Sequence, residues 1–245
     1  MLHVYIADLV GLETFYDEKL NMLHRSRAEK LSSYKMSADK VRSLGAGLLL
    51  EKGLEDYLKT NNLRSFQVDN KKDAGNMDAC KIPRDEDGRC IIEYGYGPQG
   101  KPYLKDYPEV YFSLSHSGDY AVLAIADSEV GIDVQEFRGY SEKIAKRFYH
   151  KEEVQRLDVI ADERQKEELF YKIWSGKEAF IKYTGKGMSQ DLRSFHVDLP
   201  KERILMKEQT VASYKEIMLD ADEYSCGLVF DKTIQKIDKI VKIQL

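Results

Sequence analysis

The sequence predicts a fold that mixes helices and strands, α+β or α/β rather than all-α. Apolar strand-like runs and segments of helical spacing follow one another in mixed order along the chain. The 245 residues are 42% hydrophobic and 33% charged, the composition of a globular protein with a sizeable core. This length fits one large domain or two small ones, and we find no sequence repeat.

The first sixty residues predict one strand followed by helices. The run MLHVYIADLV has the apolar character of a first strand, and it lacks the basic leader and cleavage site of a signal peptide. Helical spacing extends over residues 15–60, where Val41, Leu44 and Leu48 fall on one stripe. Residues 69–89 are rich in charge and turn formers, which predicts a loop.

The middle of the chain predicts a strand pair. The glycines and prolines of EYGYGPQGKPYL, residues 93–104, argue against regular structure over most of that stretch. VYFSLSHSGDYAVLAIAD then has the pattern of strand, turn and strand, with 120–126 apolar enough to be buried. After a turn at 127–129, we expect VGIDVQEF to return as the partner of that buried strand.

Two helices and several strands are expected in the remaining residues. Helical spacing covers 141–158 and 163–184, and Gly185 and Gly187 are expected to end the second helix. From residue 194, the runs FHVDL, YSCGLVF and IDKIVKIQL alternate as strands do.

Charge and cysteine content exclude several functional classes. A net charge of −4 and a pI near 5.8 argue against a global basic field for nucleic acid. Cys80, Cys90 and Cys226 form no Cys-x-x-Cys pair, so reduced thiols are expected rather than zinc ligands or disulfides. No apolar run approaches the roughly 20 residues of a membrane span. We therefore expect a cytoplasmic protein that binds neither nucleic acid nor membrane.

The strand GIDVQEF contains an unexpected carboxylate, because strands disfavour aspartate. Alternation along the strand places Asp133 and Gln135 on one face and Glu136 on the other. A hydrogen-bonded Asp133 at the end of a hairpin is the structural alternative to a functional one.

The helix in WSGKEAFIKYTGKG places Trp174, Glu178 and Lys182 on one face, with Lys177 about 100° round from Glu178. If that face packs near Asp133, two carboxylates and Gln135 form an oxygen-only site of the kind that suits Mg²⁺. Lys182 could then face a phosphate. The alternative is an amphipathic surface helix with an ordinary Glu–Lys pair.

Three further features could bind an anion or a flat ring. His116 lies between Ser115 and Ser117, before a glycine turn, where it could contact an anion or be a structural histidine. The turn at Lys101 and Pro102 could hold a ring against exposed backbone or be an ordinary loop. A basic run could bind phosphate or be a solvated helix face, and it contains Arg25, Arg27, Lys30, Lys35, Lys40 and Arg42.

The order of these motifs is more informative than any one of them. GKPYL, FSLSHS, GIDV and FYKIWSGKEAFIKYTGKG, in this succession, resemble the surfactin-synthetase-type 4′-phosphopantetheinyl transferases. The resemblance runs from about residue 20 to about 230 and is strongest at 100–190. It implies an α+β fold of two similar α/β halves related by a pseudo-twofold axis, with coenzyme A in the cleft. We assign residues 1–118 to the adenine and 3′-phosphate contacts, and 119–245 to the metal site, catalytic helix and carrier contacts.

The same resemblance implies a reaction. Such enzymes move 4′-phosphopantetheine from coenzyme A to a serine of an apo acyl or peptidyl carrier protein and release adenosine 3′,5′-bisphosphate. The implied catalytic residues are Asp133, Glu178 and Lys182, and the implied Mg²⁺ ligands are Asp133, Glu178 and Gln135. Carried over by motif position, the implied coenzyme A contacts are Arg27, Lys30, Arg42, Lys101, Pro102, Ser115, His116, Lys177 and Lys182.

One departure concerns the metal. Many relatives have a glutamate where this chain has Gln135, so this site would carry one negative charge fewer. Glu178 is the expected base for the carrier serine, directly or through a water.

The expected partner is an acidic carrier protein, and a monomer is expected because one chain contains both halves. We expect docking at Lys143, Lys146, Arg147 and Phe148, unless they form only an exposed helix of mixed charge. Two other functions stay open, a different Mg²⁺-dependent phosphate-ester enzyme and a non-catalytic coenzyme A-binding relative. Neither the carrier nor the choice between Mg²⁺ and Mn²⁺ follows from the sequence.

Overall fold

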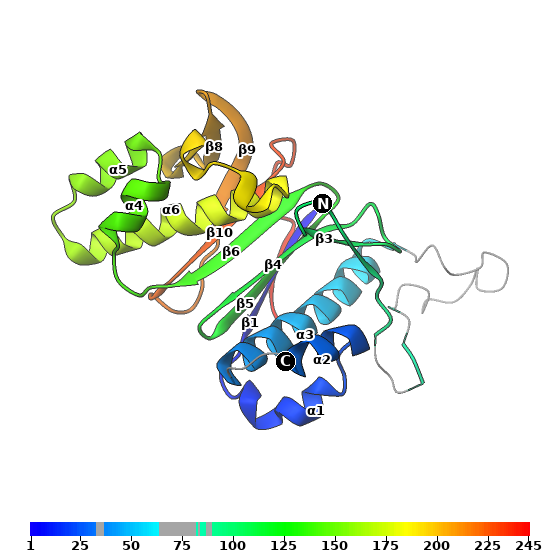
Figure 1. Cartoon of the computed structure of the whole chain (residues 1–245). Helices are drawn as coiled ribbons and strands as arrows, with labels where there is room; N and C mark the ends of the chain where they lie inside the picture. Colours follow the sequence, from blue (N-terminus) through cyan, green and yellow to red (C-terminus); the bar gives the residue numbers. More distant parts are fainter. Residues whose placement is uncertain (33–36, 64–81, 83, 87–89) are drawn as a thin grey trace. The chain divides into compact units, whose positions relative to one another are not determined.

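The computed structural model describes residues 1–32, 37–63, 82, 84–86 and 90–245, and these form two compact units (Figure 1). Unit 1 comprises Met1–Gly97, Pro102–Asp127 and Ile237–Leu245, and unit 2 comprises Pro98–Lys101 and Ser128–Lys236. Apart from Pro98–Lys101, the second unit begins at Ser128 rather than at 119, and the last nine residues of the chain return to unit 1. Cys80, Lys35 and most of the expected loop at 69–89 lie outside the described residues.

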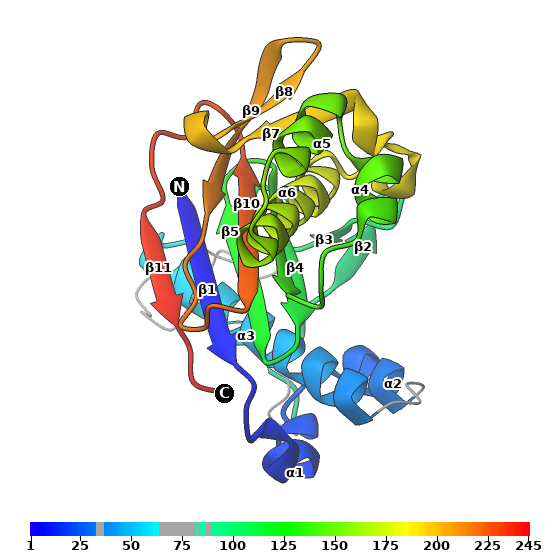
Figure 2. The same cartoon turned by 90° about the vertical axis from the view of Figure 1, so that its left-hand side faces the viewer.

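Unit 1 is built on a four-stranded sheet of order β11-β1-β5-β4 (Figure 2). The central strand β1 runs antiparallel to β5 and parallel to β11. The strand bounds are β1 Leu2–Asp8, β4 Tyr111–Ser117, β5 Tyr120–Ala126 and β11 Lys239–Lys242. The helices are α1 Tyr16–Leu20, α2 Arg25–Ser32 and α3 Ser37–Thr60, and a 3-10 turn spans Leu12–Phe15.

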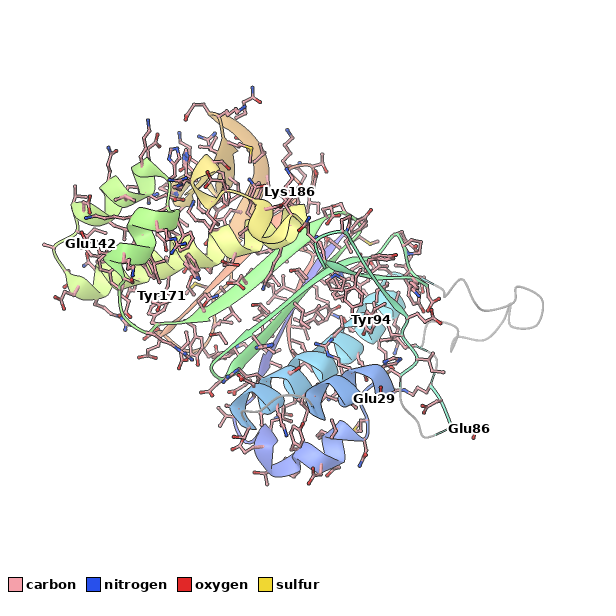
Figure 3. All side chains as sticks on the ribbon, in the orientation of Figure 1. Glu29, Glu86, Tyr94, Glu142, Tyr171 and Lys186 are labelled. Carbon is pink, nitrogen blue, oxygen red and sulfur yellow. The ribbon has the colours of Figure 1, made fainter. Side chains whose placement is uncertain are left out.

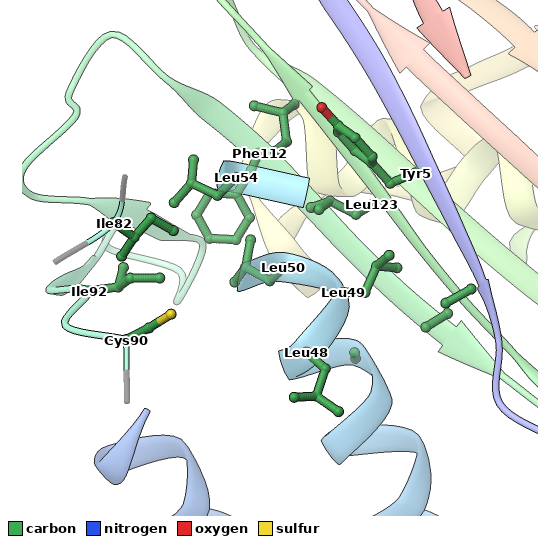
Figure 4. Packing of buried hydrophobic residues seen from close by; sticks show 14 of the residues in the cluster. Tyr5, Leu48, Leu49, Leu50, Leu54, Ile82, Cys90, Ile92, Phe112 and Leu123 are labelled. Carbon is green, nitrogen blue, oxygen red and sulfur yellow. The ribbon is translucent and has the colours of Figure 1, made fainter. Parts of the chain in front are cut away.

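The core of unit 1 lies between α3 and its sheet (Figure 4). Leu49, Leu50 and Leu54 of α3 are fully buried and belong to one cluster with Tyr5 and Leu123 of the sheet. The strands β2 Tyr94–Tyr96 and β3 Pro102–Leu104 form a separate hairpin at the two ends of the Gly-Pro-rich stretch. The expectation of irregular structure holds only for the residues between them.

Unit 2 is built on a five-stranded antiparallel sheet of order β6-β10-β9-β8-β7. The strands are β6 Val130–Glu136, β7 Phe195–Asp198, β8 Arg203–Met206, β9 Gln209–Glu216 and β10 Tyr224–Phe230. The helices are α4 Glu142–Phe148, α5 Lys151–Asp158 and α6 Glu163–Thr184, with 3-10 turns at Gly187–Ser189, Leu192–Ser194 and Leu199–Lys201. Hydrophobic side chains of α4, α5 and α6 pack together, and Tyr171 of α6 is one of them (Figure 3).

The long helix α6 has well-defined ends. Asp162 caps its N-terminus by accepting a hydrogen bond from the backbone N–H of Gln165 at 2.8 Å. Gly185 ends the helix in the left-handed region, with φ of 65°, as expected of a glycine at that position. Between these ends, α6 packs across β6 and β10. The helix that carries Glu178 therefore packs directly against the strand that carries Asp133.

One expectation about strand pairing was wrong, and one hairpin was missed. The strand VGIDVQEF, here β6, pairs with β10 and not with β5, because β5 already has β1 and β4 on its two edges. The hairpin of β8 and β9 was missed. Its turn places Lys207 and Glu208 at φ of 50° and 61°, a conformation that usually selects Asn or Gly.

The two units share one connectivity. Each has a strand, a long helix and two further strands in chain order, with the last strand paired between the other two. In unit 1 these elements are β1, α3, β4 and β5, and the order of the strands in the sheet is β1-β5-β4. In unit 2 they are β6, α6, β9 and β10, and the order of the strands in the sheet is β6-β10-β9. The expectation of an α+β fold with two similar halves is confirmed at this level. In the described part of the chain, no helix is long and apolar enough to cross a membrane.

Gly131 is required for the contact between β6 and α6. A Cβ at this position would lie 2.0 Å from the carbonyl oxygen of Ala179 and 2.5 Å from the nitrogen of Tyr183. We expect Gly131→Ala to lower the free energy of unfolding by about 1–3 kcal/mol, since backbone atoms cannot move aside as side chains can. Urea unfolding would measure the loss.

The matched control for Gly131→Ala is Gly95→Ala in β2. There the three atoms nearest to the added Cβ all belong to the end of the Tyr103 side chain, which is half-exposed and can rotate away. A Gly131→Ala variant that unfolds at the same urea concentration as Gly95→Ala would contradict this role of Gly131.

Candidate active site

Asp133 lies in the middle of β6 and is only 3% exposed. Its Oδ1 accepts a hydrogen bond from Lys182 Nζ at 2.7 Å, and its Oδ2 accepts one from the Gln135 side-chain amide at 2.7 Å. Lys182 also donates to the carbonyl oxygen of Ile132 at 3.1 Å. The structure thus brings together three of the residues that the sequence singled out, from β6 and α6.

Glu178 belongs to the same group. It lies one helical turn before Lys182 on α6, and its side chain is half-buried. Burial and the nearby charge of Asp133 raise the pKa of the Glu178 carboxyl, and Lys182 opposes the rise. Two carboxylates close enough to repel each other, with one ammonium to offset their charge, form a site that favours an added cation.

Gln135 and Glu136 follow the predicted alternation. Gln135 shares the face of Asp133 and touches its carboxylate, whereas Glu136 forms an ion pair with Arg138 at 2.8 Å. Glu136 is therefore engaged elsewhere. Gln135 donates to Asp133 through its side-chain nitrogen, so the side-chain oxygen of Gln135 can face a cation or a water.

Lys177 does not join this group, and its predicted place beside the pyrophosphate is corrected. Its side chain is fully buried and ion-paired with Glu153 of α5 at 2.7 Å. Its Nζ also donates to the carbonyl oxygens of Leu192 at 2.8 Å and Phe195 at 2.9 Å. Burial lowers the pKa of this ammonium, and Glu153 opposes the shift. With three acceptors and no exposed surface, Lys177 has no face left for a phosphate.

Lys101 is tied to unit 2 rather than free in a loop. It forms an ion pair with Glu129 and donates to the carbonyl oxygens of Val130 and Tyr183. Burial lowers the pKa of its ammonium, and Glu129 opposes the shift. Pro102 begins β3 in unit 1 and is half-buried.

The candidate contacts to the 3′-phosphate lie in unit 1. Ser115 is buried and His116 exposed near the end of β4, opposite Val122 and Ala121 of β5. Arg42 pairs with Asp39 at 2.6 Å.

Arg27 of α2 lies close to Tyr94. Burial raises the pKa of that phenol, and the arginine charge opposes the rise. The side chain of Lys30 lies outside the described residues.

Two residues that matter here were missed from the sequence. Gly131 allows the close approach of α6, and its position inside a strand was the available signal. Glu153 holds Lys177 and accepts a hydrogen bond from the backbone N–H of Val197 at 2.8 Å. Its capping-box contact with His150 is local, but nothing local marks its contacts with Lys177 and Val197, which lie 24 and 44 residues away.

The part of the chain that carries this group matches a known family. Residues 129–229 match the model of the 4′-phosphopantetheinyl transferase superfamily. The 4′-phosphopantetheinyl transferase psf-1 of Bacillus pumilus is 47% identical over 103 residues, which cover 42% of this chain and 44% of that protein. The 4′-phosphopantetheinyl transferase Sfp of Bacillus subtilis is 39% identical over 111 residues, or 45% and 49%.

A third relative matches over a longer stretch. The 4′-phosphopantetheinyl transferase gsp of Aneurinibacillus migulanus is 31% identical over 150 residues, which cover 60% of this chain and 61% of that protein. The first two relatives are thus matched over about half of their length. The residues that match the family model include β6 and α6, which carry Asp133, Glu178 and Lys182.

Proposed function

We propose, from the premise that residues 129–229 belong to the 4′-phosphopantetheinyl transferase superfamily, that this chain transfers 4′-phosphopantetheine from coenzyme A to a serine of an apo carrier protein. The observation that carries the proposal is the convergence of Asp133, Glu178 and Lys182 within the matched region. Adenosine 3′,5′-bisphosphate is the other product. The matched relatives carry the name of this activity, which supports it.

The side chains present suit Mg²⁺. Asp133 and Glu178 supply carboxylate oxygens, and Gln135 beside them can supply a neutral oxygen, which is the donor chemistry that Mg²⁺ prefers. When bound, Mg²⁺ would offset negative charge on the pyrophosphate of coenzyme A. We propose Asp133 and Glu178 as its ligands, with Gln135 as a ligand or as the holder of a water.

Lys182 and Glu178 would act on the two sides of the transferred group. Lys182 already lies beside Asp133, so its ammonium can stabilise the charge that grows on the leaving phosphate oxygen. The serine oxygen of the carrier attacks the phosphorus next to the pantetheine, and the bond to the nucleotide phosphate breaks. The hydroxyl proton passes to Glu178, the proposed base. For the other coenzyme A contacts we retain Ser115, His116, Arg27, Lys30, Arg42, Lys101 and Pro102.

Mass spectrometry of a carrier protein tests this function. The chain is mixed with coenzyme A, Mg²⁺ and a purified apo carrier, and the carrier is then weighed. We expect it to gain one phosphopantetheine. A carrier of unchanged mass, with coenzyme A bound to the chain, would favour a non-catalytic coenzyme A-binding relative. Hydrolysed coenzyme A with an unchanged carrier would favour another phosphate-ester enzyme.

We also propose that the carrier docks on the exposed side of α4. Lys143 and Arg147 are exposed there, and the Arg147 guanidinium lies 5.1 Å from the centre of the Phe148 ring. Arg147 and Phe148 line a hollow of about 380 Å³ together with residues 190–193. Lys146 is paired with Glu142, so Lys143 and Arg147 are the better probes.

Reversing both charges in Lys143→Glu/Arg147→Glu is expected to raise the KM for an acidic carrier about tenfold or more, with little change in kcat. Steady-state transfer rates at varied carrier concentration would measure this. The matched control is Lys201→Glu/Lys232→Glu, which reverses two exposed lysines elsewhere in unit 2. Equal KM values for the two double variants would place the docking surface elsewhere.

A further inference from the structure

A second cluster of ligand-type side chains lies in unit 2, formed by His150, Glu152 and His196. One ligand atom of each residue lies within 4.8 Å of those of the other two. His196 Nε2 is 3.6 Å from Glu152 Oε2, and the rings of the two histidines are stacked with centroids 4.8 Å apart. None of these residues belongs to the group around Asp133 and Glu178. Their chemistry is imidazole and carboxylate rather than oxygen alone.

The backbone beneath this cluster is firmly held. His150 caps α5, and its backbone N–H donates to Glu153 at 2.8 Å. Glu153 in turn accepts the N–H of Val197 at 2.8 Å, and this bond ties α5 to β7. Glu153 is 1% exposed and paired with the buried Lys177. Because Glu153 and Val197 are the neighbours of Glu152 and His196, this bond fixes the spacing of the segments that carry the three side chains.

The side chains above that backbone have room to adjust. The Glu152 side chain is 46% exposed, and His150 is half-buried. The ligand atoms of a four-coordinate zinc ion lie about 3.3 Å apart, so closing the cluster needs side-chain shifts of about 1 Å. The His150 ring caps α5 through Nδ1, which accepts a long hydrogen bond of 3.4 Å from the N–H of Glu152. The other ring nitrogen can therefore turn towards a metal while α5 stays in place.

We propose that His150, Glu152 and His196 form a binding site for Zn²⁺ or a similar transition-metal ion. Two imidazoles and one carboxylate are a known type of zinc ligand set, with the fourth position left to water. Imidazole ligands select such ions over Mg²⁺, so this site and the oxygen site at Asp133 would take different metals. The ion would join the start of α5 to β7.

Local charge both opposes and supports a cation here. The N-terminus of α5 carries a partial positive charge, which is unfavourable for a cation. Glu152 and Glu153 lie in the first turn and offset it, and Glu153 also neutralises Lys177.

Titration with Zn²⁺ and Co²⁺ tests the site. The chain is stripped with a chelator and studied as Glu178→Gln in excess Mg²⁺, so that the oxygen site does not bind the probe. We expect one Zn²⁺ per chain by calorimetry, and the visible absorption of four-coordinate Co²⁺ on cobalt loading. Zn²⁺ at about a hundred times its dissociation constant should raise Tm by about 5–10 °C.

His150→Asn and His196→Gln should each weaken Zn²⁺ binding by more than about tenfold, because each removes one of three protein ligands. Asparagine retains a capping oxygen for α5, so His150→Asn is expected to fold. The control is His24→Asn in unit 1, which should leave binding unchanged. The proposal is overturned by equal Zn²⁺ affinity in all three variants. It is also overturned if the chain with both histidines gives no four-coordinate Co²⁺ spectrum, a readout that needs no variant to fold.

Discussion

The Glu178→Gln variant is expected to transfer phosphopantetheine about 10²–10⁴ times more slowly than the wild type, because it removes the proposed base. It also removes one of the two carboxylates proposed to hold Mg²⁺. Glutamine keeps the size of the side chain, so the packing of α6 on β6 is preserved. Single-turnover transfer to an apo carrier, at saturating coenzyme A and Mg²⁺, is the measurement.

The free energy of unfolding shows whether Glu178→Gln loses transfer activity or loses its fold. Burial and Asp133 raise the pKa of Glu178, so its charged form is disfavoured in the folded state. Wild type should therefore lose stability relative to Glu178→Gln as the pH rises through that raised pKa. Below the ordinary pKa of glutamate the two proteins should be alike. Glu163→Gln, on the exposed first turn of the same helix, is the control for activity. Wild-type transfer by Glu178→Gln would refute its assigned role.

The Lys177→Met variant is expected to lose about 3–5 kcal/mol of unfolding free energy, because it leaves Glu153 charged and unpaired in the interior. The carbonyl oxygens of Leu192 and Phe195 lose their donor in the same step. Urea unfolding followed by circular dichroism would measure the loss. Adding Glu153→Gln should recover part of it, because glutamine removes the buried charge and keeps an acceptor for the Val197 N–H.

Lys172→Met on the same helix is the control for Lys177→Met. Lys172 is partly exposed and 3.2 Å from Glu216, a kind of pair that contributes about 0–1 kcal/mol. If Lys177→Met unfolds no more readily than Lys172→Met, then Lys177 is not the structural residue described here. In that case the role beside the pyrophosphate would be open again.

Elements with strong periodicity were predictable from the sequence. The apolar runs predicted the strands β1 and β5 with approximately correct bounds. Helical spacing and the glycine that follows it did the same for α6. Alternation in β6 put Gln135 with Asp133 and Glu136 apart from them, as the hydrogen bonds show. These predictions succeeded because each depends on residues that are close in the sequence.

Pairings between distant segments were not predictable in this way. The partner of β6 is β10, about 90 residues later, whereas the turn at 127–129 suggested a hairpin with β5. Helical spacing placed Lys177 about 100° round from Glu178, but its role depends on Glu153, which comes from another helix. A lysine with a buried carboxylate partner and one beside a ligand look alike in a single sequence.

A count of bound Mn²⁺ by electron paramagnetic resonance, with coenzyme A present, tests most directly whether Asp133 and Glu178 share one metal. Mn²⁺ replaces Mg²⁺ at oxygen sites, and a His196→Gln background removes the histidine cluster from the count. We predict one Mn²⁺ per chain, with affinity at least about tenfold weaker in both Asp133→Asn and Glu178→Gln. Unchanged Mn²⁺ affinity in both variants would contradict the shared metal site.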